Sequence, residues 1–349
     1  MEIAKTRNSS IELFRIIAML LVLIVHCNGW LVGGIPDCFD ENNISTFRIS
    51  QAIIQSFSCT CVNMFILISG YFGLKFKLKS IVNIYLTLIF IKIPLYLFNC
   101  ILVGGKFTLF ALASHFLAFS KSGYFVECYL MLMFLSPVLN AFVEKNKKQM
   151  TLWMLGFLCI EFYFAFIRNV EELGFNNGYS VIHFVSMYML GRSIFLNRES
   201  IIKIKKRYYF FIYLISTLSI SCIYFLFDKK YFSYISPLNI ISTCCFFIPF
   251  VMMNFYNKWI NWIASSTFAV YIIHTSSPIL QWLRNYDMTM LQSHPYFCYV
   301  SIMGIVILIL FFSCIMYDKV IKIVIKPINN LMVSFIQNTI SALQKNLAL

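Results

Sequence analysis

The feature that most constrains the fold is a series of apolar segments, each long enough to cross a bilayer. One crossing as a helix takes about 20 consecutive apolar residues. The chain is 60% hydrophobic and 12% charged, which is about half the charged fraction of a soluble domain. We therefore predict an all-α, polytopic transmembrane helical bundle of about ten helices. The candidate spans are residues 11–31, 50–73, 81–103, 123–143, 150–168, 179–196, 208–227, 236–256, 262–282 and 296–317.

The distribution of basic residues predicts the orientation of these spans. Cytoplasmic loops of membrane proteins are enriched in Lys and Arg. With ten crossings and a cytoplasmic N-terminus, 19 of the 28 Lys and Arg residues fall in cytoplasmic segments and 7 in outer loops. We therefore expect both termini in the cytoplasm of a multi-pass protein in the plasma membrane. The net charge of +14 does not indicate nucleic-acid binding, because the basic residues lie in short loops between apolar segments.

The same pattern predicts one membrane domain with a tail. We expect residues 1–317 to form the membrane domain and residues 318–349 to form a cytoplasmic amphipathic tail. The apolar stretch 107–119 is short and lies between glycines, so we expect a re-entrant or interfacial segment. The twelve cysteines lack the spacing of metal ligands. We therefore expect no metal site and no bound cofactor.

The first apolar segment carries three ionisable residues: Glu12, Arg15 and His26. Arg15 and His26 are eleven positions apart, which is about three turns, so both fall on one face of a helix. Glu12 lies one turn before Arg15 and is placed to pair with it. Ionisable groups in a membrane helix are costly, so a functional site is the first hypothesis. The alternative is a histidine bonded to a neighbouring helix, with Arg15 extending to the membrane interface.

Other polar residues in apolar segments are further candidates. Glu127 lies one turn into the segment 123–143, at a depth that suits orientation of the His26 ring. His183 lies just inside the segment 179–196, and Tyr271 and His274 share a face of the segment 262–282. For each of these residues the alternative is a structural one, namely a polar contact between helices or a side chain at the interface.

Together these segments resemble the type-3 acyltransferase family of integral membrane O-acyltransferases. Members open with an acidic residue, an arginine, ten residues and a histidine, which here are Glu12, Arg15 and His26. Further family motifs look like Phe65 to Tyr71, Tyr124 to Pro137, Gly191, and Thr267, Tyr271 and His274 with Ser266 alongside. The resemblance covers nearly the whole chain and makes residues 1–317 the membrane acyltransferase domain.

The chain departs from the family after the second span. Many members carry Arg-x-x-Arg there, facing the cytoplasmic donor, whereas this sequence has Lys75, Lys77 and Lys79. Lysine supplies charge without the bidentate fork of arginine. We expect these three lysines to take part in binding the donor.

The resemblance implies transfer of an acyl group, most often acetyl, from cytoplasmic acyl-CoA to a hydroxyl of a cell-envelope or exported polysaccharide. The implied catalytic residues are His26 as general base, Arg15 on the donor or an anion, and Glu127 as the group orienting His26. We further expect Glu12, Tyr271, His274 and His183 to contact substrate. Acyl-CoA is then a co-substrate, and direct transfer and an acyl-histidine intermediate both remain open. The alternative function is a transporter or flippase of a lipid-linked glycan, which would move glycan without consuming a thioester.

Overall fold

The computed structural model describes residues 7–39, 45–102, 104–117, 119, 123–170 and 173–347. Over these residues the chain is helical, and no strand occurs among them. Lys5 and Lys121, which enter the loop charges predicted above, and Ala118 of the stretch 107–119 lie outside the described residues.

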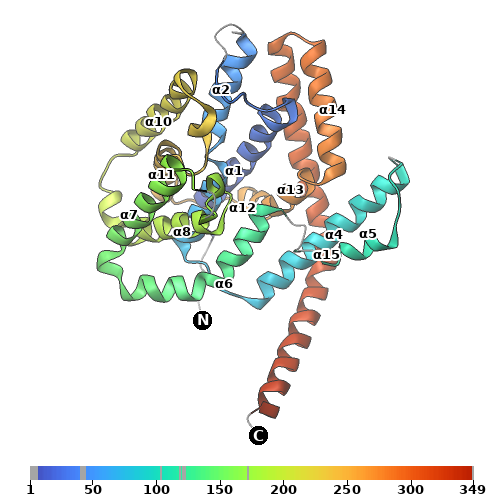
Figure 1. The fold of residues 1–349 in the computed structure, drawn as a ribbon. Helices are drawn as coiled ribbons and strands as arrows, with labels where there is room; N and C mark the ends of the chain where they lie inside the picture. Colours follow the sequence, from blue (N-terminus) through green and yellow to red (C-terminus); the bar gives the residue numbers. More distant parts are fainter. Residues whose placement is uncertain are drawn as a thin grey trace.

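Figure 1 shows the helices in a bundle with one long helix extending beyond it. The α-helices are α1 Ser9–Asn28, α2 Thr46–Ser58, α3 Cys61–Phe72, α4 Leu78–Leu102, α5 Leu109–Ser114, α6 Tyr124–Lys145, α7 Met150–Glu161, α8 Val181–Leu196, α9 Arg198–Ile201, α10 Lys206–Leu226, α11 Pro237–Val251, α12 Lys258–Ala264, α13 Thr267–His274, α14 Ser277–Ser293 and α15 Tyr296–Leu347. A π-helix, η5 Phe162–Ile167, continues α7. Short 3-10 helices are η1 Trp30–Val32, η4 Lys147–Gln149, η7 Asn176–Gly178 and η8 Lys229–Phe232.

The all-helical membrane fold is confirmed, but the number of spans is lower than predicted. Among the described residues, eight helices are long and apolar enough to cross a membrane, and a bent pair raises the number to nine at most. The predicted span 179–196 is the 16-residue helix α8, which is below the length of a full crossing. The predicted span 262–282 is broken, because the segments Lys258–His274 and Ser277–Ser293 meet at 80°.

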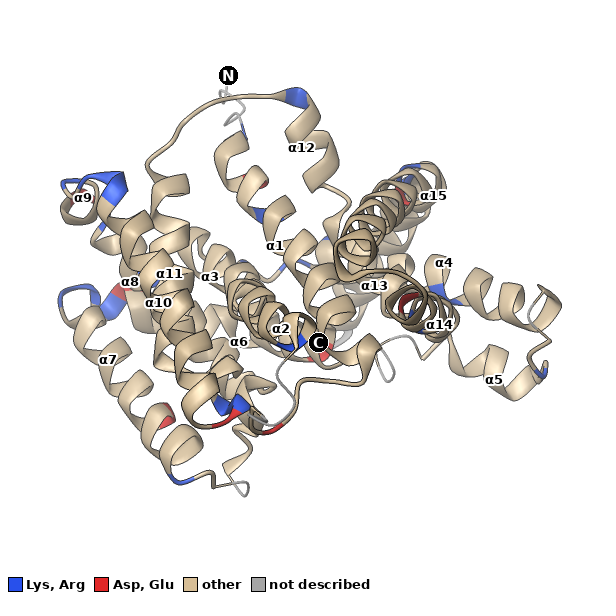
Figure 2. Ribbon diagram, turned by 90° about the horizontal axis from the view of Figure 1, so that it is seen from above, with Lys and Arg blue, Asp and Glu red and all other residues tan. Residues whose placement is uncertain are grey.

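Charged residues follow the membrane pattern. In Figure 2 the ribbons of the helices are mostly uncharged, and blue Lys and Arg segments gather at helix ends and connections, as around α9. The α9 segment carries Arg198, and Lys203, Lys205 and Lys206 follow it directly. Charges are thus kept out of most of the apolar helix length, as a bilayer requires.

Helix α1 lies inside the bundle and packs against α2, α3, α11, α12 and α13. Its start is fixed by Asn8, whose side chain accepts a hydrogen bond from the Ser10 backbone N–H. The Ser10 hydroxyl donates to the carbonyl of Phe250 at 2.7 Å. Phe14 is fully buried and packs against three phenylalanines of α11, Phe246, Phe247 and Phe250, with ring centroids 5.1–5.7 Å apart. These contacts hold the face of α1 that carries Arg15 and His26 in a fixed direction.

Helices α3 and α8 cross at two glycines. A Cβ on Gly70 would lie 2.3 Å from the carbonyl oxygen of Tyr188, and one on Gly191 would lie 2.6 Å from that of Leu67. Because both obstacles are backbone atoms, only glycine allows this approach. Both glycines belong to the motifs noted in the sequence, and they bring α8 into the centre of the bundle, where His183 and Tyr188 are fully buried.

Helix α15 contains 52 residues and continues through positions 317 and 318 without a break. At about 1.5 Å per residue it is roughly 78 Å long, more than twice the thickness of the hydrocarbon core. It packs against α13 and α4, and its C-terminal part projects beyond the bundle (Figure 1). Residues 318–347 therefore continue the last span as the same helix. The stretch 107–119 contains the six-residue helix α5, which is too short to cross.

Candidate active site

A cavity of about 530 Å³ follows one face of α1. Arg15, Met19, Val22 and His26 line it, at the spacing of one helix face. The predicted shared face of Arg15 and His26 is therefore confirmed, and the two residues lie about 16 Å apart along the axis at 1.5 Å per residue. The other lining residues are Val25, Cys61, Val62, Phe65, Ser69, Leu74, Lys75, Lys79, Ser80, Asn83, Ile84, Tyr124, Phe125, Tyr129, Met133, Tyr234, Thr267, Phe268, Tyr271 and Asn329.

At one end of the cavity His26 contacts His274 of α13. The Nδ1 atom of His26 lies 3.1 Å from the Nε2 atom of His274. The other ring nitrogen of His274, Nδ1, lies 2.7 Å from the carbonyl oxygen of Val270. Since a carbonyl only accepts, Nδ1 of His274 carries a proton and donates it there.

This arrangement determines which nitrogen of His26 is free. His274 is 1% exposed, and an unpaired charge at such a buried position is costly, so its ring is neutral and its Nε2 has no proton. His26 Nδ1 then donates to His274 Nε2. The remaining nitrogen of His26, Nε2, keeps a lone pair on a ring that lines the cavity. His274 thus holds His26 in the tautomer of a general base.

At the other end of the cavity Arg15 is held by Glu12. Glu12 is 5% exposed, and its two oxygens lie 2.6 Å from Arg15 Nη1 and 2.6 Å from Arg7 Nε. The predicted pairing of Glu12 with Arg15 is confirmed, and a second partner, Arg7, was not predicted, because it precedes the apolar segment. One carboxylate facing two guanidinium groups leaves this end positively charged.

Two of the three lysines proposed for the donor lie at this positive end. Lys75 and Lys79 line the cavity and Lys77 does not, although all three lysines are exposed. Lys79 lies in the first turn of α4, and its Nζ donates to Asn330 Oδ1 of α15 at 3.0 Å.

Tyr271 lies beside the histidine pair and separates two cavities. Its ring centroid is 5.9 Å from that of His274 and 5.4 Å from that of Phe125. It lines the cavity of α1 and also a second cavity of about 330 Å³ between α4, α5 and the break between α13 and α14. Polar residues of this second cavity are Lys92, Tyr96, Asn99, Ser114, His115, Thr275, Ser276 and Ser277.

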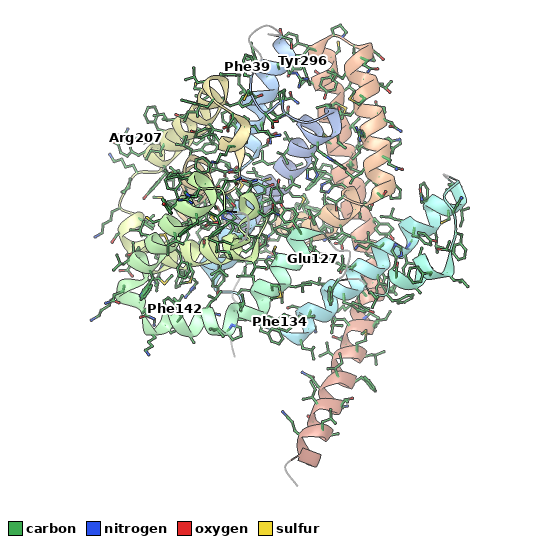
Figure 3. All side chains as sticks on the ribbon, viewed as in Figure 1. Phe39, Glu127, Phe134, Phe142, Arg207 and Tyr296 are labelled. Carbon is green, nitrogen blue, oxygen red and sulfur yellow. The ribbon has the colours of Figure 1, made fainter. Side chains whose placement is uncertain are left out.

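Glu127 does not orient His26 in this structure. It is exposed at the start of α6, where α6 approaches the centre of the bundle (Figure 3), and does not line the cavity. The position beside His26 Nδ1 belongs to His274. The helical phase of α6 explains this, since its neighbours Val126 and Cys128 are the buried residues at this point.

His183 lies in a buried polar network and does not line the cavity of α1. Its Nδ1 is 2.8 Å from Glu161 Oε1, and its Nε2 is 2.8 Å from Asn63 Oδ1. The Asn63 amide nitrogen donates to the carbonyl of Tyr234 at 2.9 Å, so its oxygen accepts from His183. With Nε2 of His183 protonated, a further proton lies in the hydrogen bond between His183 Nδ1 and Glu161, and both side chains are nearly fully buried. This network joins α3, α7 and α8. Both ring nitrogens of His183 are engaged within it, Nδ1 with Glu161 and Nε2 with Asn63.

Several cavity residues were not predicted as site residues. Tyr124 and Tyr129 line the cavity and fall in the motif from Tyr124 to Pro137, and Tyr234 lines it without lying in any motif. Tyrosine is so frequent in this chain that its spacing selects none of them. The Tyr129 hydroxyl lies 3.3 Å from that of Ser69, in the motif from Phe65 to Tyr71. Asn329 comes from the second half of α15, beyond the predicted membrane domain.

Comparison with protein families identifies the chain. A family model described as an acyltransferase domain matches residues 8–318, which is nearly the whole helical bundle and includes Arg15, His26 and His274. Comparisons with curated proteins and with solved structures gave no match. A histidine whose ring lines a cavity accords with this family assignment, because a base assists acyl transfer. The chain belongs to the type-3 acyltransferase family and is a membrane acyltransferase.

Proposed function

We propose that this acyltransferase moves an acyl group, acetyl in the simplest case, from acyl-CoA to a hydroxyl of a cell-envelope or exported polysaccharide. The observation that carries the proposal is the cavity along α1, with a free imidazole nitrogen at one end and a cluster of cations at the other. An acyl-CoA matches these two ends of the cavity, because it carries a reactive thioester at one end and phosphates at the other.

The charged end favours a phosphate-bearing donor. Arg15, Lys75 and Lys79 line that end, while the walls toward His26 are formed by apolar and aromatic residues such as Met19, Val22 and Phe65. Cations attract phosphates over some distance, and an apolar channel suits the less polar arm that joins the phosphates to the thioester. The separation of about 16 Å between Arg15 and His26 along α1 leaves room for this arm.

The transfer step follows from the tautomer of His26. The acceptor hydroxyl gives its proton to His26 Nε2 as its oxygen attacks the thioester carbonyl carbon. The resulting imidazolium donates that proton to the departing sulfur as the carbon–sulfur bond breaks, which yields the ester and free CoA. General base catalysis of this kind contributes about 10²- to 10⁴-fold to the rate. Binding of both substrates in one cavity supplies the orientation.

His274 supports this step as a positioning residue. Its Nε2 accepts from His26 Nδ1 at 3.1 Å, which keeps the basic nitrogen directed away from α13. When His26 becomes an imidazolium, this bond becomes charge-assisted and therefore stronger. Tyr271, which lines the cavity next to the pair, contacts the substrate in this proposal, and His274 does not.

The second cavity supports entry of the acceptor from the side opposite the donor. It meets the first cavity at Tyr271 and is lined by hydroxyl, amide and aromatic groups, including Tyr96, Asn99 and His115. Such a mixture suits a sugar, whose hydroxyls need donors and acceptors and whose apolar face rests on rings. In the plasma membrane, with both termini cytoplasmic, the donor would enter from the cytoplasm and the glycan from outside.

The test is conversion of a labelled thioester by membranes that contain the protein. Membranes are incubated with acetyl-CoA labelled in the acetyl group, and alkali-labile label is measured in the extracted glycan together with released CoA. The proposal expects equal amounts of glycan ester and free CoA. If glycan crosses the membrane without release of CoA, the transporter alternative is supported instead.

A further inference from the structure

A third cavity, of about 230 Å³, lies where α4 crosses α15. It shares Lys79, Asn83 and Asn329 with the lining of the cavity of α1, so the two cavities are neighbours. From α4 it takes Lys79 and Asn83, one turn apart. From α15 it takes Lys322, Ile325, Lys326, Asn329 and Asn330, which repeat at the spacing of one helix face.

The charge of this cavity is positive. Lys79, Lys322 and Lys326 line it, and no carboxylate is among its described lining residues. Lys322 is already engaged, because its Nζ lies 2.6 Å from the carboxylate of Asp318, one turn earlier on α15, and donates to the carbonyl of Ser265 at 2.6 Å. On the α1 side Glu12 is already shared by Arg7 and Arg15. Lys79 and Lys326 form no ion pair with a carboxylate among the described residues, and positive charges that line one cavity repel one another unless an anion lies between them.

The amides complete a polar lining. Asn329 is 3% exposed, and its Nδ2 donates to the carbonyl of Lys79 at 3.3 Å. Its Oδ1 is buried without a partner among the described residues. A buried acceptor without a donor is costly. A ligand with an N–H or O–H group would satisfy it, and Asn83 and Asn330 offer further amides at the same place.

We infer that Lys79, Lys322 and Lys326 form a phosphate-binding site between α4 and α15, which holds the nucleotide end of the acyl donor while the thioester lies at His26. This inference rests on the proposed function. Two of the three lysines and both asparagines of α15 lie beyond residue 318, where the match to the family ends.

The same chemistry would also attract the phosphate of an anionic lipid headgroup, and the experiment separates the two sources. Binding of CoA, dephospho-CoA and pantetheine is measured on the full-length protein purified in detergent, so that no acceptor is needed. The variants are Lys326→Gln and the double variant Lys79→Gln/Lys326→Gln. Lys77→Gln is the matched control, since Lys77 is an exposed lysine near Lys79 that lines neither cavity.

We expect the Kd for CoA to rise about tenfold in Lys326→Gln and further in the double variant, as for loss of charge-assisted bonds. Lys77→Gln should leave the Kd for CoA unchanged, and all proteins should bind pantetheine equally weakly.

If the wild type binds CoA but both variants bind it as tightly, the phosphate site is refuted and the proposed function is not. If the variants change only the response of activity to anionic lipid in vesicles, the lipid is the ligand and the donor assignment is refuted. If the wild type does not bind CoA, both proposals fail.

Discussion

His26 and His274 are 248 positions apart in the sequence, and their Nδ1 and Nε2 atoms lie 3.1 Å apart at the end of the cavity along α1. The Val270 carbonyl, 2.7 Å from Nδ1 of His274, fixes the direction of the hydrogen bond between the rings. The pair therefore leaves Nε2 of His26 unprotonated, on a ring that lines the cavity.

Replacing His274 tests its role in positioning. In His274→Ala, the His26 ring loses its acceptor, and we expect kcat to fall by about tenfold to a hundredfold, which corresponds to loss of one buried hydrogen bond. KM for acyl-CoA should change little, because His274 does not line the cavity. His274→Gln, whose amide oxygen is able to accept the bond, should recover part of the loss. Glu127→Gln is the control, and it should retain activity within twofold. Equal losses in kcat for Glu127→Gln and His274→Ala would contradict this account.

Adding a methyl group at the crossing of α3 and α8 tests the fold. A Cβ at Gly70 or Gly191 meets backbone carbonyls at 2.3 and 2.6 Å, so the helices must separate. Gly70→Ala and Gly191→Ala should each destabilise the protein by about 2 kcal/mol or more. The measurement is the Tm of the protein in detergent, followed by the change of its fluorescence on unfolding without a thiol-reactive dye. Gly156→Ala and Gly304→Ala are matched helical controls, because a Cβ there meets no atom. An unchanged Tm for the first pair would refute the close crossing.

Replacing His183 distinguishes a structural from a substrate-binding role. His183→Ala leaves Glu161 buried without its hydrogen-bond partner, which costs about 1–3 kcal/mol or more. We expect a lower Tm and a smaller folded yield, with KM for acceptor and donor unchanged in the protein that folds. Glu161→Gln keeps a hydrogen-bond partner for the ring and should be less destabilising. A KM change without a change in Tm would restore His183 to the substrate site.

The sequence predicted the class of fold because the apolar segments are long, and a helix satisfies its own backbone hydrogen bonds inside a bilayer. It overestimated the number of spans at two places. The segment 179–196 is apolar enough to span, but only 16 residues of it are helical. In the segment 262–282, Thr275-Ser276-Ser277-Pro278 ends one helix and begins another, and a hydropathy average does not register this break.

The site was predicted where its residues share a helix and missed where it depends on contacts between helices. Periodicity placed Arg15 and His26 on one face of α1, as observed. It contains no information on which helix faces that side, so Glu127 was predicted for the position beside His26 where His274 lies. Lys326 and Asn329 were not predicted as site residues, because the sequence places them in the tail. Only the continuation of α15 past residue 318 brings them to α4.

The most direct test of the central claim is acetyl transfer from labelled acetyl-CoA to envelope glycan in membranes that contain wild type or His26→Ala at matched expression. Arg15→Ala is measured in parallel. If His26 is the base, label in the glycan should fall at least about a hundredfold in His26→Ala, with the protein still inserted in the membrane. Arg15→Ala should raise KM for acetyl-CoA. Full transfer by His26→Ala would contradict the account and remove the chemistry from α1.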